Sequence, residues 1–135
     1  MAGLFNFEVH TPFRLFYINQ VQSVTLTLAD GEIEVYANHS PFTAVTVTGI
    51  LRIKEGEGRW RSAFISEGIL EVKSEKNVLM VEYAEWPEEI DRERALASKT
   101  EAEKTLADST FKFYVDKAKL DKRRAEYRLK ISEEN

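Results

Sequence analysis

The segment VTLTLADGEIEVYA (24–37) decides the fold of the first part of the chain. In VTLTL (24–28) apolar residues alternate with threonines, which is the period of a strand with one buried face. Asp30-Gly31 follows, a strong short-range signal for a β-hairpin, and the alternation resumes in IEVYA (33–37). The segment therefore predicts two antiparallel strands joined by a tight turn.

Similar short runs continue on both sides of this hairpin, up to about residue 86. Alternating or apolar runs begin with FNFEV (5–9) and recur at 45–47, 50–53, 60–65, 69–72 and 78–83. Turn signals such as EGEG (55–58) separate them. About eight to ten short strands at this density predict an N-terminal antiparallel β-sandwich or barrel.

Beyond Pro87 the glycines disappear and the apolar period becomes helical. Pro87 and the two glutamates after it suit a first helical turn, so a helix is expected from about 87 to 105. Asp108-Ser109-Thr110 predicts a turn and an N-cap, and a second helix is expected to about residue 132. The short link predicts an antiparallel two-helix hairpin, which gives two domains, 1–86 and 87–135.

Composition excludes several classes of protein. The chain has 135 residues with no cysteine and two histidines, which leaves little material for a thiol nucleophile, a zinc centre or a Ser-His-Asp triad. Ser66 beside Glu67 is the best remaining nucleophile candidate, and it is weak. No apolar run is long enough to span a membrane, and the N-terminus lacks the features of a signal peptide. A cytosolic, non-enzymatic protein is expected, able to sit on a membrane-bound partner.

Charge divides the chain unevenly. Residues 1–90 carry 7 Lys/Arg and 13 Asp/Glu, a net −6, whereas residues 91–135 carry 12 and 10, a net +2. The basic excess is concentrated in the second predicted helix. This pattern indicates a basic hairpin that is suited to an acidic partner.

Three segments, in order along the chain, carry a resemblance to a known family. GEIEVYANHSP (31–41), AFISEGILEV (63–72) and EEIDRERA (88–95) resemble the ε subunit of bacterial F-type ATP synthases. The chain departs from the family's usual glycines at Glu34, at Ala37-Asn38 and at Glu67-Gly68. These positions lie in predicted turns, so the departures concern loop shape.

The resemblance implies a non-catalytic subunit of the central stalk of a proton-translocating ATP synthase. Its sandwich would bind the γ subunit and rest on the c ring of the membrane sector, and its hairpin would inhibit ATP hydrolysis at the catalytic α/β head. It would be peripheral, on the cytoplasmic face of the bacterial plasma membrane, with no membrane insertion and no nucleic-acid partner. The coupling ion, proton or sodium, would be chosen in the membrane ring.

In some members of the family the helical hairpin binds ATP as a regulatory ligand; no cofactor is otherwise required. The resemblance implies ATP contacts from Glu85, Asp91, Arg94, Arg124 and Arg128. Guanidinium groups suit phosphates because their fixed fork of donors matches the oxygens. The alternative is an i,i+3 ion pair between Asp91 and Arg94, with the other arginines on a solvated face.

The same resemblance implies two protein interfaces. Tyr36, His39, Pro41 and Phe42 surround a loop that would face the rotor. For His39 the favoured interpretation is a hydrogen-bonded loop histidine. Lys122, Arg123 and Lys130 would form a basic face that meets an acidic loop of the catalytic subunit. A rival hypothesis from another class is a free-standing ATP sensor that uses the hairpin as a clamp; binding to γ without nucleotide separates the two.

Overall fold

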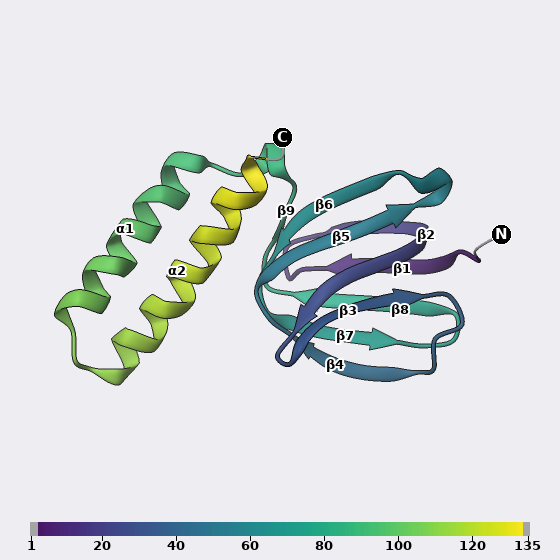
Figure 1. The fold of residues 1–135 in the computed structure, drawn as a ribbon, viewed down its shortest axis with the longest axis horizontal. Helices are drawn as coiled ribbons and strands as arrows, with labels where there is room; N and C mark the ends of the chain where they lie inside the picture. Colours follow the sequence, from purple (N-terminus) through teal and green to yellow (C-terminus); the bar gives the residue numbers. More distant parts are fainter. Residues whose placement is uncertain (1–2, 134–135) are drawn as a thin grey trace. The chain divides into compact units, whose positions relative to one another are not determined.

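The structure is a computed structural model that describes residues 3–133 of the chain. It divides into two compact units, of which one ends at Glu85 and the other begins at Trp86 (Figure 1). The first unit is built of strands and the second of helices. The predicted class, a β-sandwich followed by a two-helix hairpin, is confirmed.

Within residues 3–133, nine strands form the first unit. They are β1 (Phe5–His10), β2 (Leu15–Leu28), β3 (Gly31–Tyr36), β4 (Phe42–Thr46), β5 (Gly49–Glu55), β6 (Trp60–Ile65), β7 (Gly68–Val72), β8 (Lys76–Val81) and β9 (Ala84–Glu85). A 3-10 turn, Gly56–Gly58, joins β5 to β6 at the predicted turn. In this part of the chain the strands pair antiparallel except β1 with β8, which pair parallel.

The long strand β2 belongs to both layers of the sandwich. Its first half pairs with β1, beyond which lie β8, β7 and β4; its second half pairs with β3 and β5, beyond which lie β6 and β9. Figure 1 shows β2 crossing the sandwich, with β5 along one edge of its second half and β3 along the other. The register of β2 against β5 shifts between Val21 and Ser23, a bulge that increases local twist where the strand changes partners.

The sequence missed the first half of β2 and misplaced one turn. Leu15–Val21 does not alternate because Phe16 and Tyr17 are both buried, next to a register shift against β1. In the β2–β3 hairpin Leu28 pairs with Gly31, so the turn residues are Ala29 and Asp30 instead of Asp30 and Gly31. Gly31 has a φ of 137°, which explains why a glycine is needed directly after the turn.

The core lies between the two layers. The largest fully buried side chains of this unit come from both layers: Phe7, Val9, Val21, Val24, Leu26, Leu51, Ile53, Phe64, Ile65, Leu70 and Leu79. Each buried aliphatic or aromatic side chain contributes roughly 1.5–3 kcal/mol through removal from water. The sandwich therefore has a core of its own.

The second unit begins with a 3-10 turn, η2 (Pro87–Glu89), followed by α1 (Arg92–Asp108) and α2 (Lys112–Ser132). The prediction that the first helix starts at Pro87 was wrong, and the helix also ends later than 105. Asp91 is the N-cap of α1: it has an extended backbone, and its carboxylate accepts the Arg94 backbone N–H at 3.1 Å. This cap places the helix start after Asp91, beyond the 3-10 turn.

The N-cap of the second helix also differs from the prediction. Phe111 occupies that position without a side-chain cap, and Ser109 is instead the C-cap of α1. The Ser109 hydroxyl accepts the Phe111 N–H at 3.3 Å. The predicted end of the second helix agrees with the structure.

Small residues form much of the contact between the two helices. Ala95 and Ala102 of α1 and Ala118 and Ala125 of α2 are at most 4% exposed. Alanines allow close approach of the helix backbones but bury little apolar area each. Phe111, directly before α2, is 71% exposed, because it lies at the turn beyond the last residue of α1. Within residues 3–133, neither helix combines the length and the apolar character that a membrane span requires.

Gly68 is the tightest point of the sandwich. A Cβ atom on Gly68 would lie 2.0 Å from the Met80 carbonyl oxygen and 2.7 Å from Val81 Cγ1. The first of these atoms belongs to the backbone of β8, which pairs with β7, so it cannot move aside without disturbing the ladder. Glycine is therefore required here by close backbone approach.

We predict that Gly68→Ala lowers the free energy of unfolding by about 3 kcal/mol or more, because β7 and β8 must separate to admit the methyl group. Gly56→Ala is the matched control: nothing lies within 4 Å of the position that its Cβ would take, and its φ is not left-handed. That change should be neutral or slightly stabilising. Urea unfolding of both variants, followed by circular dichroism, tests the pair; equal midpoints would contradict the assignment.

Candidate functional site

The loop between β3 and β4 carries the residues expected at the rotor interface. Tyr36 ends β3, Phe42 begins β4, and His39 and Pro41 are exposed between them. The His39 ring meets the Phe42 ring edge-on with centroids 5.0 Å apart, and its Nδ1 lies 3.0 Å from the Ser40 carbonyl oxygen. The structure therefore groups His39 and Phe42 as one aromatic feature of the loop.

Tyr36 is held separately from that pair. Its hydroxyl donates a hydrogen bond of 2.6 Å to Glu34, two residues earlier on the same face of β3. Because the carboxylate stabilises the protonated phenol, the bond raises the pKa of Tyr36 above its ordinary value. The side chain is 52% exposed and presents its ring to solvent.

A second exposed feature of the sandwich was not predicted from the sequence. Val45, Ile69 and Met80 are direct neighbours across β4, β7 and β8, and they are 69%, 44% and 41% exposed. We call these three residues the apolar row. Strand alternation places each of these side chains on the outer face of its layer. An apolar residue at an outward position is therefore the sequence feature that could have predicted this surface.

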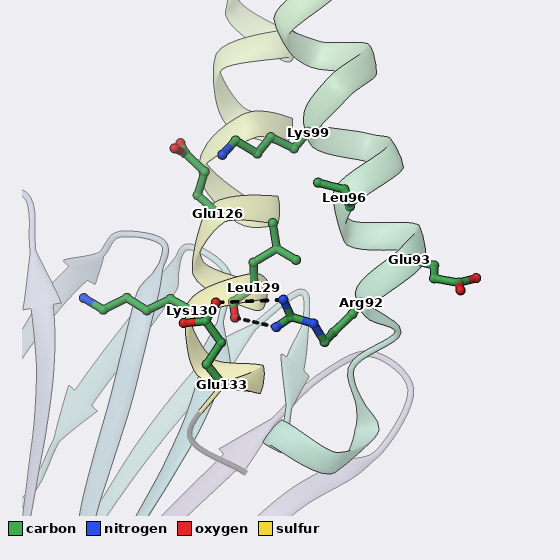
Figure 2. A pocket seen from close by; sticks show the side chains of 8 residues that line it. All are labelled: Arg92, Glu93, Leu96, Lys99, Glu126, Leu129, Lys130 and Glu133. Atoms are coloured by element: carbon green, nitrogen blue, oxygen red, sulfur yellow. Dashed lines mark hydrogen bonds and ion pairs between the residues drawn. The ribbon is translucent and has the colours of Figure 1, made fainter.

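The open end of the helical hairpin contains a groove. Figure 2 shows its lining: Arg92, Glu93, Leu96 and Lys99 of α1, with Glu126, Leu129, Lys130 and Glu133 from the C-terminal part of α2 and the residue after it. Arg92 reaches across it, and its Nη1 donates to the Leu129 carbonyl oxygen at 3.3 Å and to Ser132 Oγ at 2.5 Å. Arg92 Nη2 lies 3.8 Å from Glu133 Oε1. Arg92 has no predicted role in the sequence analysis.

Three of the residues expected at an ATP site lie on the opposite side of the hairpin from this groove. Arg94 follows Arg92 by two residues, about 200° of helical turn, so it points away from the groove. Arg124 and Arg128 likewise stand two residues from the groove residue Glu126. The structure thus brings Arg94, Arg124 and Arg128 to one side of the hairpin, and Asp91 is the N-cap of α1.

The antiparallel pairing also brings these residues to similar positions along the axis of the hairpin. Arg92 contacts Ser132 at the open end, and Lys122 contacts Glu103 further along at 3.5 Å. Arg94 therefore lies roughly level with the last two turns of α2, near Arg128. The Asp91 carboxylate accepts the backbone N–H of Arg94, so the two residues are linked by a helix cap. Glu85 belongs to the other unit: it lies in β9 and pairs with Phe64 of β6.

The three residues of the expected inhibitory face differ in their surroundings. Lys122 forms the ion pair with Glu103, and the Arg123 guanidinium lies 5.5 Å from the centroid of the Tyr127 ring. Lys130 lines the groove. In the closed hairpin, Lys122 is thus engaged by an acidic residue of α1. Among residues 3–133, no three His, Asp or Glu side chains are grouped so as to hold a metal ion.

Comparison with known proteins decides the family. Residues 4–87 match the family model described as the ATP synthase, Delta/Epsilon chain, beta-sandwich domain. The chain belongs to this family. It is 43% identical to the ATP synthase epsilon chain of Caldicellulosiruptor bescii over 97% of this chain and 95% of that relative. It is 39% identical to the epsilon chain of Caldanaerobacter subterraneus, over 98% and 96%. The resemblance carried by the three sequence segments is confirmed.

Solved structures share the fold. The chain is similar to a chain in the cryo-EM structure of the Euglena gracilis mitochondrial ATP synthase, with a TM-score of 0.80 at 20% identity, covering 93% of this chain and 79% of that one. A chain of the Tetrahymena thermophila mitochondrial ATP synthase central stalk and c ring gives 0.65 at 15% identity, covering 97% and 98%. At these identities the likeness establishes the fold.

Two of the departures from the usual glycines of this family have a structural explanation. Asn38 has a φ of 64°, a left-handed conformation that asparagine tolerates better than most residues. Asn38 therefore adopts a left-handed turn conformation without glycine. At Glu67-Gly68 only the second position requires glycine, and the Glu67 carboxylate accepts a 2.5 Å hydrogen bond from Thr48 Oγ1.

Proposed function

We propose that the chain is the ε subunit of a bacterial F-type ATP synthase, a non-catalytic part of the central stalk that joins the γ subunit to the c ring. Identity with curated epsilon chains over almost the whole length of both proteins supports this role. The complex it serves would place it on the cytoplasmic face of the plasma membrane as a peripheral subunit. The observation that carries the proposal within the structure is the apolar row.

The polar side chains that an enzyme could use serve the sandwich itself. Ser66 is fully buried, and its hydroxyl accepts the Tyr83 backbone N–H at 2.9 Å. His10 is hydrogen-bonded at 2.7 Å to Glu8, and this bond lowers the pKa of the Glu8 carboxyl. The Ser66 contact joins two segments of the sandwich and the His10 contact lies within β1, so both are consistent with a binding module.

The apolar row is suited to γ because it combines exposure with a rigid support. Its three side chains stand on paired strands, with Leu70 and Leu79 buried directly behind them in the core. Apolar side chains held in this way lose little conformational entropy on binding, and they are typical of the centre of a protein interface. The loop residues Tyr36, His39, Pro41 and Phe42 would then face the c ring.

We predict that Ile69→Glu weakens binding to γ by at least about 2 kcal/mol, roughly 30-fold, because it buries a charge at the centre of the interface. Trp60→Glu is the control, since Trp60 is 52% exposed on β6, in the other layer of the sandwich. Calorimetric titration with the γ subunit, without nucleotide, measures both. Equal affinities would remove the apolar row from the interface, and failure of the parent chain to bind would favour a free-standing sensor.

We further propose that the hairpin inhibits ATP hydrolysis through Lys122, Arg123 and Lys130 once it is released from its closed form. Support comes from the Lys122–Glu103 ion pair, in which an acidic side chain already binds this face. An acidic loop of the catalytic head would replace Glu103 when the helices separate. Exposed ion pairs contribute up to about 1 kcal/mol each and are screened by salt, so such an exchange is readily reversible.

Reversing the three charges together, as Lys122→Glu, Arg123→Glu and Lys130→Glu, should increase hydrolysis by the assembled enzyme at low ATP. Several changes are combined because each pair is weak. Reversal of Lys104, Lys112 and Lys119 makes the same change in net charge at other exposed positions of the hairpin and should leave inhibition intact. If both triple variants behave alike, inhibition depends on overall charge or on another surface.

ATP is the regulatory ligand we propose for the other side of the hairpin. Arg94, Arg124 and Arg128 share that side, and their guanidinium groups fit the phosphates of a nucleotide. A ligand that touches both helices can bind only while they are paired. Binding to the closed form alone would stabilise it by about 2.7 kcal/mol at a hundredfold excess over the dissociation constant.

Arg124→Ala with Arg128→Ala should therefore abolish ATP binding by the isolated chain and leave the assembled enzyme inhibited even at high ATP. Lys112→Ala with Lys119→Ala removes the same charge from the same helix and should preserve binding. Calorimetry up to millimolar ATP measures the first step, and hydrolysis assays measure the second. Heat and affinity unchanged in the arginine variant would show that these side chains form a solvated face only.

A further inference from the structure

Arg92 occupies an unfavourable place in its own helix. It is the first residue of α1, where the backbone N–H groups give the helix end a partial positive charge. A cation there is repelled by that end, and the acidic residues Asp91 and Glu93 on either side are of the expected sign. The position of Arg92 therefore needs an explanation outside α1.

The other helix supplies that explanation. The last four carbonyl groups of a helix have no partner within the helix. In α2 the Leu129 carbonyl would receive the N–H of Glu133 if the helix continued, but that N–H is directed to Lys130 O at 3.3 Å. Leu129 O accepts instead from Arg92 Nη1 at 3.3 Å and from Ser132 Oγ at 2.8 Å.

The charge and the shape of the Arg92 side chain both suit the end of α2. Arg92 brings a positive charge to the C-terminal end of α2, where the partial charge is negative. One guanidinium nitrogen donates to the Leu129 carbonyl and to the Ser132 hydroxyl. The other faces Glu133, and Figure 2 shows Arg92 reaching toward Leu129 and Glu133. Three groups at the end of α2 thus converge on one side chain of α1. Lysine has the charge but lacks the planar fork that reaches several acceptors together.

The rest of the helix pair is weakly held. Apart from Ile131 near the end of α2, the buried residues of the two helices are alanines, and further along the hairpin the ion pair of Lys122 with Glu103 is partly exposed. Arg92 closes the hairpin at its open end, the end that must separate first if the helices unzip toward their connecting turn. Its side chain is 52% exposed, so the contact can break and re-form without unfolding a core.

We propose that Arg92 is the latch of the hairpin: by capping the last turn of α2 it holds the two helices closed, and its release permits α2 to move away from α1. The latch rests on the proposed function in one respect, namely that the opened hairpin is the form that inhibits hydrolysis. ATP would bind on the opposite side of the same helix pair. The latch would determine what fraction of the hairpins is closed without ATP, and ATP binding would then increase that fraction.

The test measures opening directly in the full-length chain. Because the chain has no cysteine, Ala97→Cys and Glu126→Cys provide unique sites for two spin labels, one on each helix. Arg92→Gln, Arg92→Lys and the control Lys99→Gln are compared in this background. Lys99 lines the same groove, and its side chain makes no hydrogen bond or ion pair within residues 3–133.

Arg92→Gln should raise the fraction of long label distances roughly 3- to 10-fold, the range expected for loss of one partly exposed charge-assisted contact. Arg92→Lys should give a smaller rise, and Lys99→Gln none. Amide hydrogen exchange in residues 129–133 should accelerate in the same order. Distances and exchange in Arg92→Gln that match those in Lys99→Gln would overturn the latch.

The assembled enzyme separates the two proposals. If Arg92→Gln opens the hairpin and lowers ATP hydrolysis at low ATP, both the latch and the inhibitory role are supported. If it opens the hairpin while hydrolysis is unchanged, the latch stands and the inhibitory role is wrong. If the hairpin does not open, the latch is wrong whatever hydrolysis does.

Discussion

One strand shared between two layers is the constraint on which the sandwich depends. β2 is 14 residues long, so one half can complete the layer of β1 while the other half completes the layer of β5. Its buried residues Val21, Val24 and Leu26 lie fully within the core. Because both layers share this strand, their spacing is set by continuous backbone as well as by packing. Close backbone approach at Gly68 is a second constraint on the sandwich, since β7 must lie tightly against β8 for the layer to form.

The helical unit is built on a different physical principle. Its helices meet largely through alanines, which permit close approach but remove little apolar surface from water. Among the polar contacts that join the helices, those of Arg92 and of Lys122 are partly exposed. Each contact in such a helix pair contributes little to the free energy of closing. The binding free energy of one ligand can therefore match or exceed the total. A reversible appendage and a rigid anchor can thus be parts of one chain.

The two sides of the hairpin carry different chemistry. One side has the groove, with Arg92 and Lys130, and the other has Arg94, Arg124 and Arg128. This separation follows from the helical period, because residues two apart on a helix face nearly opposite ways. A ligand on one side need not compete with contacts on the other. Both sides nevertheless act on the same event, the pairing of α1 with α2, and this provides the unit with a means of combining two signals.

The sequence by itself determined the class of fold and the family. Alternation in residues 24–37 and the helical period beyond Pro87 are local patterns that each element needs for its own burial. It did not determine Leu15–Val21, where a register shift against β1 removes the alternation. The apolar row exists only because the pairing of β4, β7 and β8 brings three separate outward positions together. The role of Arg92 depends on acceptors 37 to 41 residues away, which no local pattern reveals. Tertiary structure decided these features because they are contacts between segments, and contacts of that kind are set by strand register and helix pairing.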